Sequence, residues 1–357
     1  MSAAMTIHAF ALTPLDLLFF RDGRPFEAAA QVRSGLPQPQ TVAGAVRSWL
    51  LARAGCDFTR LAEDIKGGAS FGEACAAQGE KIAAIGRLRF RGPWFSCNGV
   101  SPLLPAPATL RRKKHGDDTH FVRLDPLRKH LPGWRSEHGL QPLWYKGNDR
   151  LEAVAGYLTL DGMAKFLRGD VPPPDTLVPA KKLYAEDRRS SVAISPQHLT
   201  ALEGQIFSVG FLALRPNVSL LLEVAAPSEM SFPEQGVIRL GGEARQVHLR
   251  ALPNPIAWPR PTPKEGRKLF ILTTPAVFAD GWKPSALSPL AAAVPTPMPV
   301  SGWDMARGGP KSTRFAVQAG AVYFVNDTST ASAEAFRDGE DTAAGAGHTL
   351  EGVWNYV

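Results

Sequence analysis

The sequence has little cysteine and no long apolar run. Its 357 residues include three cysteines, Cys56, Cys75 and Cys97, and no Cys-x-x-Cys pair. This argues against a disulfide framework or a thiolate zinc site and favours reduced, buried thiols in a cytosolic protein. No stretch reaches the roughly 18 uninterrupted apolar residues that a membrane helix needs. Because no basic region precedes an apolar run near the N-terminus, we expect no secretory signal and a cytoplasmic location.

Common catalytic and metal-binding motifs are also missing. The eight histidines form no His-x-His or His-x-x-x-His pair, and no Gly-x-Ser-x-Gly or His-Glu-x-x-His motif occurs. We therefore expect no metal and no cofactor. His348 stands beside a glycine-bearing loop and is a candidate general base for a ribose 2′-hydroxyl, although a non-catalytic histidine is the commoner case.

Glycine and proline are abundant, with 33 and 31 residues, whereas apolar residues make up 44% and charged residues 20%. These values are typical of a globular chain that is rich in loops, and they argue against an all-helical architecture. The length is about twice that of an ordinary domain, which suggests two domains. Three consecutive prolines, Pro172 to Pro174, are the expected linker between them.

Local patterns predict mixed secondary structure in both halves. Alternation predicts a strand over Thr6–Ala11, and a helix is expected to start at Thr41 as its N-cap. Further segments are assigned by the same signals: helical structure over Phe58–Gln78 with a break at Gly67–Gly68, a strand from about Ile82, and strands over Gln205–Leu214, Val218–Val224, Val237–Leu240, Leu269–Thr273 and Ala321–Val325. Strands combined with few helices fit a pair of small α+β domains.

The positive charge is concentrated in one segment. The whole chain carries a net charge of +7, from 40 basic and 33 acidic residues. Between Arg87 and Arg135 there are eleven basic and three acidic residues, a local net charge of +8. Aromatic residues are interleaved with them, among them Trp94, Phe95, Phe121 and Trp134. Basic side chains neutralise phosphates and aromatic rings stack on bases, so this segment favours a nucleic-acid partner over a merely solvated surface.

Residues 92–150 show no periodicity and contain seven prolines, so they are expected to form a long irregular insertion. Two glycine-bearing segments follow later in the chain. Gly345-Ala346-Gly347, with Gly352 further on, matches neither a Walker A loop nor a dinucleotide fingerprint. Glycines at this spacing, like Gly241 and Gly242 after a predicted strand, permit close approach to phosphate oxygens or simply form a turn.

Several of these segments together resemble a known family. Residues 14–26 (PLDLLFFRDGRPF) and 41–47 (TVAGAVR) resemble the opening of a RAMP-superfamily family, the third subunit of the Cmr complex, which is the type III-B CRISPR effector. The resemblance recurs at residues 187–189, 240–243, 272–275 and 319–324 and at the closing glycine loop. It therefore covers almost the whole chain.

The resemblance implies an α+β fold of two ferredoxin-like, RRM-related domains. They would span residues 1–171, with the loop-rich basic insertion at about 92–150, and residues 172–357, which end in the glycine loop. It also implies a non-catalytic subunit that holds the 5′ handle of the crRNA. The partners would be the large polymerase-like subunit and a backbone RAMP subunit, with no membrane involved, in antiviral defence.

On this basis we expect a set of RNA-binding residues. Arg21 and Arg24 would contact handle phosphates or base edges. For Arg47, RNA binding and a structural role are equal alternatives. The full set is Arg21, Arg24, Arg47, Arg111, Arg112, Lys113, Lys114, Arg188, Arg189, Gly241, Gly242, Gly345, Gly347 and His348.

Two other functions remain open from the sequence. One is a metal-independent RAMP endoribonuclease that processes repeat RNA, with His348 or a histidine of the insertion as base. The other is a purely scaffolding subunit whose basic insertion meets an acidic protein face.

Overall fold

The computed structural model describes residues 4–21, 31–115, 118–129, 131–136, 138–195, 197–260, 267–326, 332–337, 339 and 341–357. The chain forms two compact units. Unit 1 comprises residues 1–93, 183–255 and 300–314, and unit 2 comprises residues 94–182, 256–299 and 315–357. Each unit thus combines segments that are far apart in the sequence. Whether residues 1–171 and 172–357 fold as separate domains stays a prediction.

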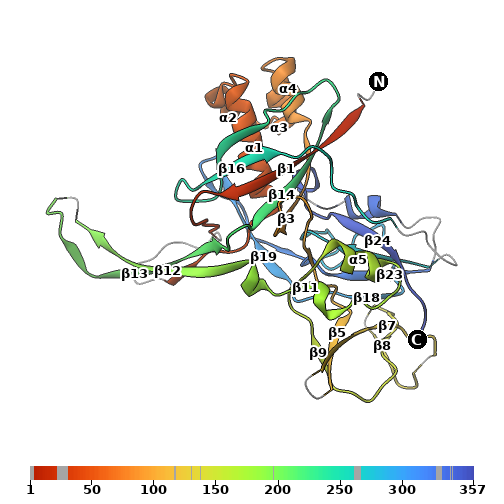
Figure 1. Ribbon diagram of the computed structural model, residues 1–357. Helices are drawn as coiled ribbons and strands as arrows, with labels where there is room; N and C mark the ends of the chain where they lie inside the picture. The colour runs from red at the N-terminus through yellow and green to blue at the C-terminus, as the bar shows by residue number, and fades with distance from the viewer. Residues whose placement is uncertain are drawn as a thin grey trace. The chain divides into compact units, whose positions relative to one another are not determined.

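A five-stranded sheet forms the centre of unit 1 (Figure 1). Strand β1 (Met5–Pro14) lies in its middle and pairs antiparallel with β14 (Ser219–Pro227) and β16 (Gln246–Ala251). The outer strands are β15 (Gln235–Arg239) and β3 (Arg89–Ser96), which gives the order β15-β16-β1-β14-β3. The sheet is held by apolar burial, because most side chains in the centre of β1 and along β14 are inaccessible to solvent.

Four helices connect β1 to β3 in unit 1. They are α1 (Pro39–Arg53), α2 (Phe58–Lys66), α3 (Phe71–Ala76) and α4 (Glu80–Gly86). The apolar side of α1 buries Val42, Val46 and Leu50. The predicted break at Gly67–Gly68 is confirmed, since α2 ends at Lys66 and a Ser70–Glu73 capping box starts α3.

Two boundaries predicted from the sequence were wrong. The first helix begins at Pro39 with Gln38 as N-cap, not at Thr41, because a proline fits the first helical position, where no backbone N–H is needed. Ile82 lies in α4 rather than in a strand, and it is buried together with Ala83 and Ile85 at helical spacing. The following strand, β3, begins only at Arg89.

The other predicted apolar strands are confirmed. The segments Thr6–Ala11, Gln205–Leu214, Val218–Val224, Val237–Leu240, Leu269–Thr273 and Ala321–Val325 coincide, within a few residues at the ends, with β1, β13 (Ala201–Leu214), β14, β15, β17 (Lys268–Leu272) and β23 (Val322–Val325). Burial alternates at the start of β3, because Leu88 just before it and Phe90 within it are buried while Arg89 is exposed.

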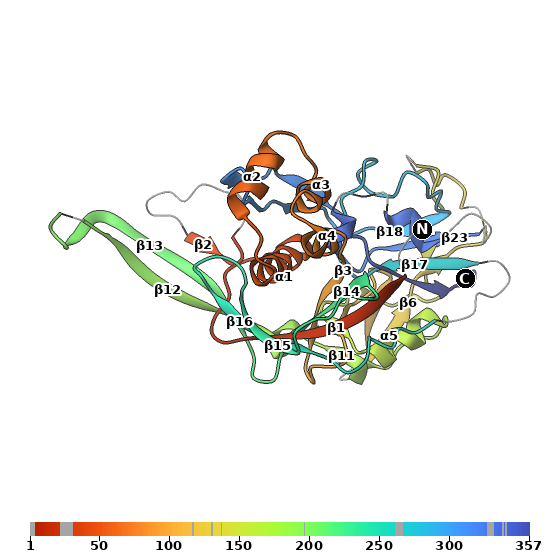
Figure 2. The same ribbon diagram turned by 90° about the horizontal axis from the view of Figure 1, so that it is seen from above.

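A long two-stranded hairpin projects from unit 1 in both views (Figures 1 and 2). It consists of β12 (Tyr184–Ile194) and β13, which pair antiparallel from Tyr184↔Leu214 to Ile194↔Ala201. Strand β2 (Gln31–Arg33) adds to β13 in parallel orientation. Most side chains of β12 are exposed.

Unit 2 is centred on a second antiparallel sheet with the order β18-β23-β17-β24. Its outer strands are β18 (Ala291–Ala293) and β24 (Thr349–Val353). Phe270, Tyr323 and Phe336 form part of the core on this sheet and are fully buried. Helix α5 (Leu160–Leu167) buries Met163, Phe166 and Leu167 in the same unit.

The segment 92–150 contains strands, so the expectation of a wholly irregular insertion was wrong. Strands β5 (Leu110–His115), β6 (Asp118–Arg123) and β9 (Leu151–Ala153) form an antiparallel sheet with β5 in the centre. Two very short strands, β7 (Asp125–Pro126) and β8 (Leu143–Trp144), pair nearby. Strand β5 could not be predicted from apolar periodicity because most of its side chains are charged. It is defined by pairing on both edges and not by burial of alternate residues.

The remaining elements are short. They are β4 (Leu104–Pro105), β10 (Tyr157–Leu158), β11 (Leu177–Val178), β19 (Met298–Val300), β20 (Trp303–Asp304), β21 (Gly309–Pro310), β22 (Arg314–Ala316) and the 3₁₀ helices η1 (Pro174–Thr176), η2 (Ala180–Lys182), η3 (Ala333–Arg337) and η4 (Thr342–Ala344). The mixed fold class is therefore confirmed, with few helices and mostly antiparallel sheets. Among the described residues, no helix has the length and apolar character to cross a membrane.

The three cysteines are free thiols. Cys75 is buried, and burial raises the pKa of its thiol to about 11. Cys97 is exposed, so the expectation that all three thiols are buried holds only in part.

Candidate nucleic-acid interface

Ion pairs divide the basic residues between Arg87 and Arg135 into two groups. The first group has acidic partners: Arg87 with Glu80, Arg91 with Glu223, Lys113 with Asp149 and Arg123 with Asp125. The second group has no acidic partner within ion-pair distance among the described residues and consists of Arg89, Arg111, Arg112, Arg128, Lys129 and Arg135. The positive charge of the second group is therefore not neutralised by a neighbouring carboxylate of the described residues.

Strand β5 presents two of these unpaired arginines. Arg111 is half-buried, and among the described residues its side chain makes a single long hydrogen bond, of 3.5 Å from Nη1 to the carbonyl oxygen of Leu110. Burial lowers the pKa of the Arg111 guanidinium, because water is removed without a compensating anion. The Nε of Arg112 is also buried and has no hydrogen-bond partner among the described residues. Both side chains are partly desolvated cations that a phosphate would satisfy.

The other cations of β5 are less available. Lys113 Nζ lies 2.7 Å from Asp149 Oδ2, and this hydrogen bond raises the pKa of Lys113. Lys113 alternates with Arg112, so it shares a face of the sheet with Arg111. The side chain of Lys114 lies outside the described residues.

The loop of residues 127–142 is closed on itself at its neck. Strands β7 and β8 pair, and the amide of Leu127 donates to the carbonyl oxygen of Pro142 at 3.0 Å. The amide of Gln141 donates to Leu290 O at 2.8 Å, which ties the loop to the segment before β18 in the same unit. Loop ends that meet in this way are typical of an Ω-loop.

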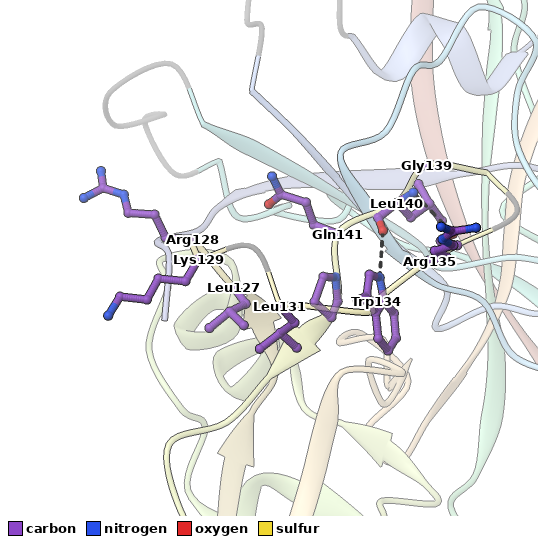
Figure 3. A pocket seen from close by; sticks show the side chains of 11 residues that line it. Leu127, Arg128, Lys129, Leu131, Trp134, Arg135, Gly139, Leu140 and Gln141 are labelled. Carbon is purple, nitrogen blue, oxygen red and sulfur yellow. Dashed lines mark hydrogen bonds between the residues drawn. The ribbon is translucent and has the colours of Figure 1, made fainter.

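The loop encloses a pocket of about 440 Å³ (Figure 3). Its lining contains leucines and a proline as well as three cations, one tryptophan and one side-chain amide. The residues are Leu127, Arg128, Lys129, Leu131, Trp134, Arg135, Ser136, Gly139, Leu140, Gln141 and Pro142. The sequence indicated the charge and the tryptophan of this segment, but it carried no signal that the loop closes around a pocket.

The arginines near the N-terminus have different surroundings. Arg21 is exposed at the end of a described segment, and Arg24 lies outside the described residues. Arg47 Nη2 donates to Leu88 O at 2.8 Å, and its guanidinium lies 4.8 Å from the ring centre of Phe90 and 5.4 Å from that of Phe71. These contacts connect α1 to α3 and β3, which is the structural alternative for Arg47.

Arg188 and Arg189 on β12 are paired with neighbouring acids. Arg188 Nε lies 3.0 Å from Glu186 Oε1, and Arg189 Nε lies 3.2 Å from Asp187 Oδ1. The guanidinium of Arg189 also lies 5.6 Å from the ring centre of Phe211. Residues 186–189 of the β12–β13 hairpin are therefore close to neutral as a group. The RNA contact expected of Arg188 and Arg189 stays a prediction.

The glycines form backbone turns in both units. The amide of Gly242 donates to Phe19 O at 2.7 Å, and a Cβ at Gly241 would lie 2.4 Å from the same oxygen. In unit 2, the amide of Gly347 donates to Pro275 O at 3.0 Å and that of Gly345 to Thr342 O at 3.1 Å. In this conformation the amides of Gly242, Gly345 and Gly347 are used within the chain.

His348 lies in an aromatic cluster of unit 2. Its ring centre is 5.1 Å from that of Trp94 and 4.9 Å from that of Trp258. Its Nδ1 is 2.6 Å from Thr273 Oγ1, which also accepts a hydrogen bond from Trp94 Nε1 at 3.2 Å. The sequence did not indicate this cluster, because its members come from positions 94, 258, 273 and 348. In the part of the chain that the structure describes, no group of three or more His, Cys, Asp or Glu residues is arranged to hold a metal ion.

The fold and the candidate interface define a mixed α/β protein of two antiparallel-sheet units with a basic insertion in unit 2. Residues 10–354 match the family described as CRISPR-associated protein (Cas_Cmr3). The chain therefore belongs to the Cas_Cmr3 family, and the resemblance inferred from the sequence is confirmed.

Solved structures share the fold. One similar chain is in a cryo-EM structure of the type III-B Cmr-beta bound to cognate target RNA, with a TM-score of 0.52 and 14% identity. A second is in the structure with cognate target RNA and AMPPnP, with a TM-score of 0.51 and 14% identity. Both matches cover 88% of this chain and 86% of the other. No protein with a curated description matches the chain by sequence.

Proposed function

We propose that this protein is a non-catalytic, RNA-binding subunit of a type III-B CRISPR effector complex. In the complex it holds the 5′ handle of the crRNA and docks on the large polymerase-like subunit and on a backbone RAMP subunit. The setting is antiviral defence in the cytoplasm. Membership of the Cas_Cmr3 family supports the assembly, and the chains of similar fold belong to structures described as Cmr-beta bound to target RNA.

The observation that carries RNA binding is the set of cations in unit 2 without acidic partners. Five cations have no acidic partner among the described residues and are therefore available to phosphates: Arg111 and Arg112 on β5, and Arg128, Lys129 and Arg135 in the loop. Each phosphate contact releases condensed counterions from the RNA, which favours binding and makes it dependent on salt. Arg111 gains further, because an anion would offset the desolvation that lowers its pKa.

We infer a ferredoxin-like topology for both units from the order of their sheets. When the outer strand β15 is set aside, the sheet of unit 1 contains β1, β3, β14 and β16 in chain order, and their spatial order is fourth, first, third, second. The strands of unit 2 are β17, β18, β23 and β24, and they have the same spatial order. This order is the one generated by a split βαβ arrangement. In unit 1 the helices α1 to α4 occupy the first crossover, whereas the described residues of the second crossover in unit 2 form the 3₁₀ helices η3 and η4.

The contacts of His348 support the non-catalytic role. The Nδ1 atom and Thr273 Oγ1 are within hydrogen-bond distance, and the ring lies against two tryptophans. Its backbone amide donates to Thr274 Oγ1 at 2.9 Å. These contacts hold the glycine loop against the end of β17, which is a structural use of the histidine.

The experiment that tests RNA binding compares two arginine pairs. The R111A/R112A variant removes unpaired cations, and R188A/R189A removes cations that already have acidic partners. Binding of a fluorescein-labelled crRNA handle oligonucleotide is measured by anisotropy at several KCl concentrations. We expect R111A/R112A to reduce the salt slope by about 2, since each lost phosphate contact reduces it by about 1. R188A/R189A is expected to change the slope by less than about 1.

Equal losses in the two variants would show that the ion pairs do not govern RNA contact. A wild-type protein that binds no RNA, while its insertion crosslinks to a partner subunit, would contradict the proposal in favour of scaffolding. Cleavage of repeat RNA by the isolated protein in chelator, lost in H348A, would establish the endoribonuclease instead.

A further inference from the structure

The pocket inside the loop 127–142 combines an apolar floor with an oriented aromatic ring. Leu127 and Leu131 lie along one side of it (Figure 3), and Pro142 also lines it. Trp134 keeps 47% of its surface exposed, and its Nε1 donates to Leu140 O at 3.4 Å. The ring is thus restrained at one edge while its surface remains open to a ligand. A flat, weakly polar group is the kind of ligand that such a surface binds.

Polar groups at the pocket define the rest of that ligand. In Figure 3, Arg128 and Lys129 project at one end, and Arg135 lies beside Trp134 at the other. None of the three has an acidic partner among the described residues, and Arg128 is held by stacking at 5.4 Å on the ring of Tyr356. Gln141 Oε1 is buried without a hydrogen-bond partner in the described part of the chain. The ligand therefore has an N–H donor and carries anionic groups on two sides.

We propose that this pocket takes one unstacked nucleotide of the bound RNA strand. The base stacks on Trp134 over the apolar floor, and an N–H of its Watson–Crick edge donates to Gln141 Oε1. The phosphates on its two sides meet Arg128 with Lys129 and, at the other end, Arg135. All four RNA bases have an N–H on that edge, so the pocket binds a base without demanding one identity.

Two observations favour an internal nucleotide over an acidic peptide or a free nucleotide. The cations lie at both ends of the pocket, which matches a nucleotide with a phosphate on each side, whereas a free mononucleotide carries its charge at one end. The pocket has both an unpartnered amide oxygen, which needs a donor, and an exposed aromatic ring, and a nucleobase has an N–H donor and a flat face in one group. The inference rests on the RNA-binding function proposed above.

The test is an abasic scan. Fluorescein-labelled handle RNAs, one complete and the others with a single abasic nucleotide at successive positions, are titrated against the full chain. In the wild type we expect one abasic position to weaken binding about 5- to 100-fold, the loss of one stacked base. The W134A variant should bind the complete RNA more weakly by the same factor and be insensitive to the abasic site at that position.

Matched variants keep the test independent of folding. W144A removes another exposed tryptophan of the insertion that does not line the pocket, and it should behave as the wild type. W134F retains an aromatic ring and should keep most of the affinity. R128A/K129A should lower the affinity for the complete RNA and for every abasic RNA by the same factor.

Three results would overturn the inference. The first is W134A binding as tightly as the wild type, and the second is an abasic penalty that persists unchanged in W134A. In both cases RNA binding itself stands and only the pocket assignment fails. The third is that R128A/K129A and W134A lose a partner subunit during purification with unchanged RNA affinity, which would assign the pocket to a protein. A wild type without any RNA affinity would overturn the proposed function as well.

Discussion

At the scale of single residues, arginines from the same basic segment have opposite roles. Among the described residues Arg111 and Arg112 have no acidic partner, whereas Arg123 is a buried structural residue with 3% of its side chain exposed. Arg123 Nε donates to Asp125 Oδ1 at 2.9 Å, and its Nη1 and Nη2 donate to the carbonyl oxygens of Phe166 and Val353. The sequence shows the charge of all three but not these carbonyl partners, because Phe166 and Val353 are 43 and 230 residues away.

We expect the substitution R123M to lower the free energy of unfolding by about 3–5 kcal/mol, because it leaves the carboxylate of Asp125 buried and uncompensated. Desolvation already raises the pKa of Asp125, and the Arg123 guanidinium opposes that change. Urea denaturation followed by tryptophan fluorescence measures the loss. The double variant R123M/D125L, which removes both charges, should recover a substantial part of it.

The control for R123M is R87A, which removes an exposed arginine from a surface ion pair. It should change the stability by no more than about 0.5 kcal/mol. Similar losses in R87A and R123M would mean that Arg123 contributes no more than a surface charge.

At the scale of elements, apolar patterning identified the strands that are buried and missed those that are polar. Strands β1, β14, β17 and β23 contain apolar runs, and their predicted positions are confirmed. Strand β12 was not predicted, because its sequence YAEDRRSSVAI is mostly polar and mostly exposed. It exists through its ladder with β13 rather than through a buried face, and a ladder depends on a partner that local sequence does not specify. The charged strand β5 was missed for the same reason.

The glycine turn before β24 provides a test at this scale. Gly347 has a φ of 73°, and a Cβ there would lie 2.6 Å from Phe336 O, next to the core of unit 2. We expect G347A to reduce stability by roughly 2–5 kcal/mol, from left-handed strain of about 1–2 kcal/mol and a further 1–3 kcal/mol of overpacking. Thermal and urea unfolding measure the difference.

Gly281 offers the matched control for G347A. It lies in the same unit with a similar φ of 78°, and a Cβ there would have no heavy atom within 4 Å. G281A should therefore cost only the strain of about 1–2 kcal/mol. If the two variants lose equal stability, the close approach to Phe336 has no energetic consequence.

At the scale of the whole molecule, charge was predictable from the sequence and the division into units was not. The excess of positive charge lies in the insertion, and the structure leaves five of its cations in unit 2 without acidic partners among the described residues. The division into two units depends on strand pairing across the sequence: β1, from residues 5–14, is flanked by strands from residues 219–227 and 246–251. Long-range antiparallel pairing of this kind leaves no signal in the local sequence. The domain boundary predicted from the sequence therefore falls at the proline linker Pro172–Pro174.

The same pairing predicts how the chain responds to division at that linker. A fragment of residues 1–171 contains β1 and β3 but not β14, which lies between them in the sheet of unit 1. A fragment of residues 172–357 contains β14, β15 and β16 without β1, which pairs with both β14 and β16. Each fragment would expose unpaired central strands with buried apolar faces, and we expect each to lack cooperative thermal unfolding when expressed alone.

Co-expression should restore a folded complex of the two fragments, because the pairing that holds unit 1 is non-covalent. Circular dichroism and calorimetry on each fragment and on the co-expressed pair decide the matter. A fragment of residues 1–171 that unfolds cooperatively by itself would show that the linear boundary separates true domains.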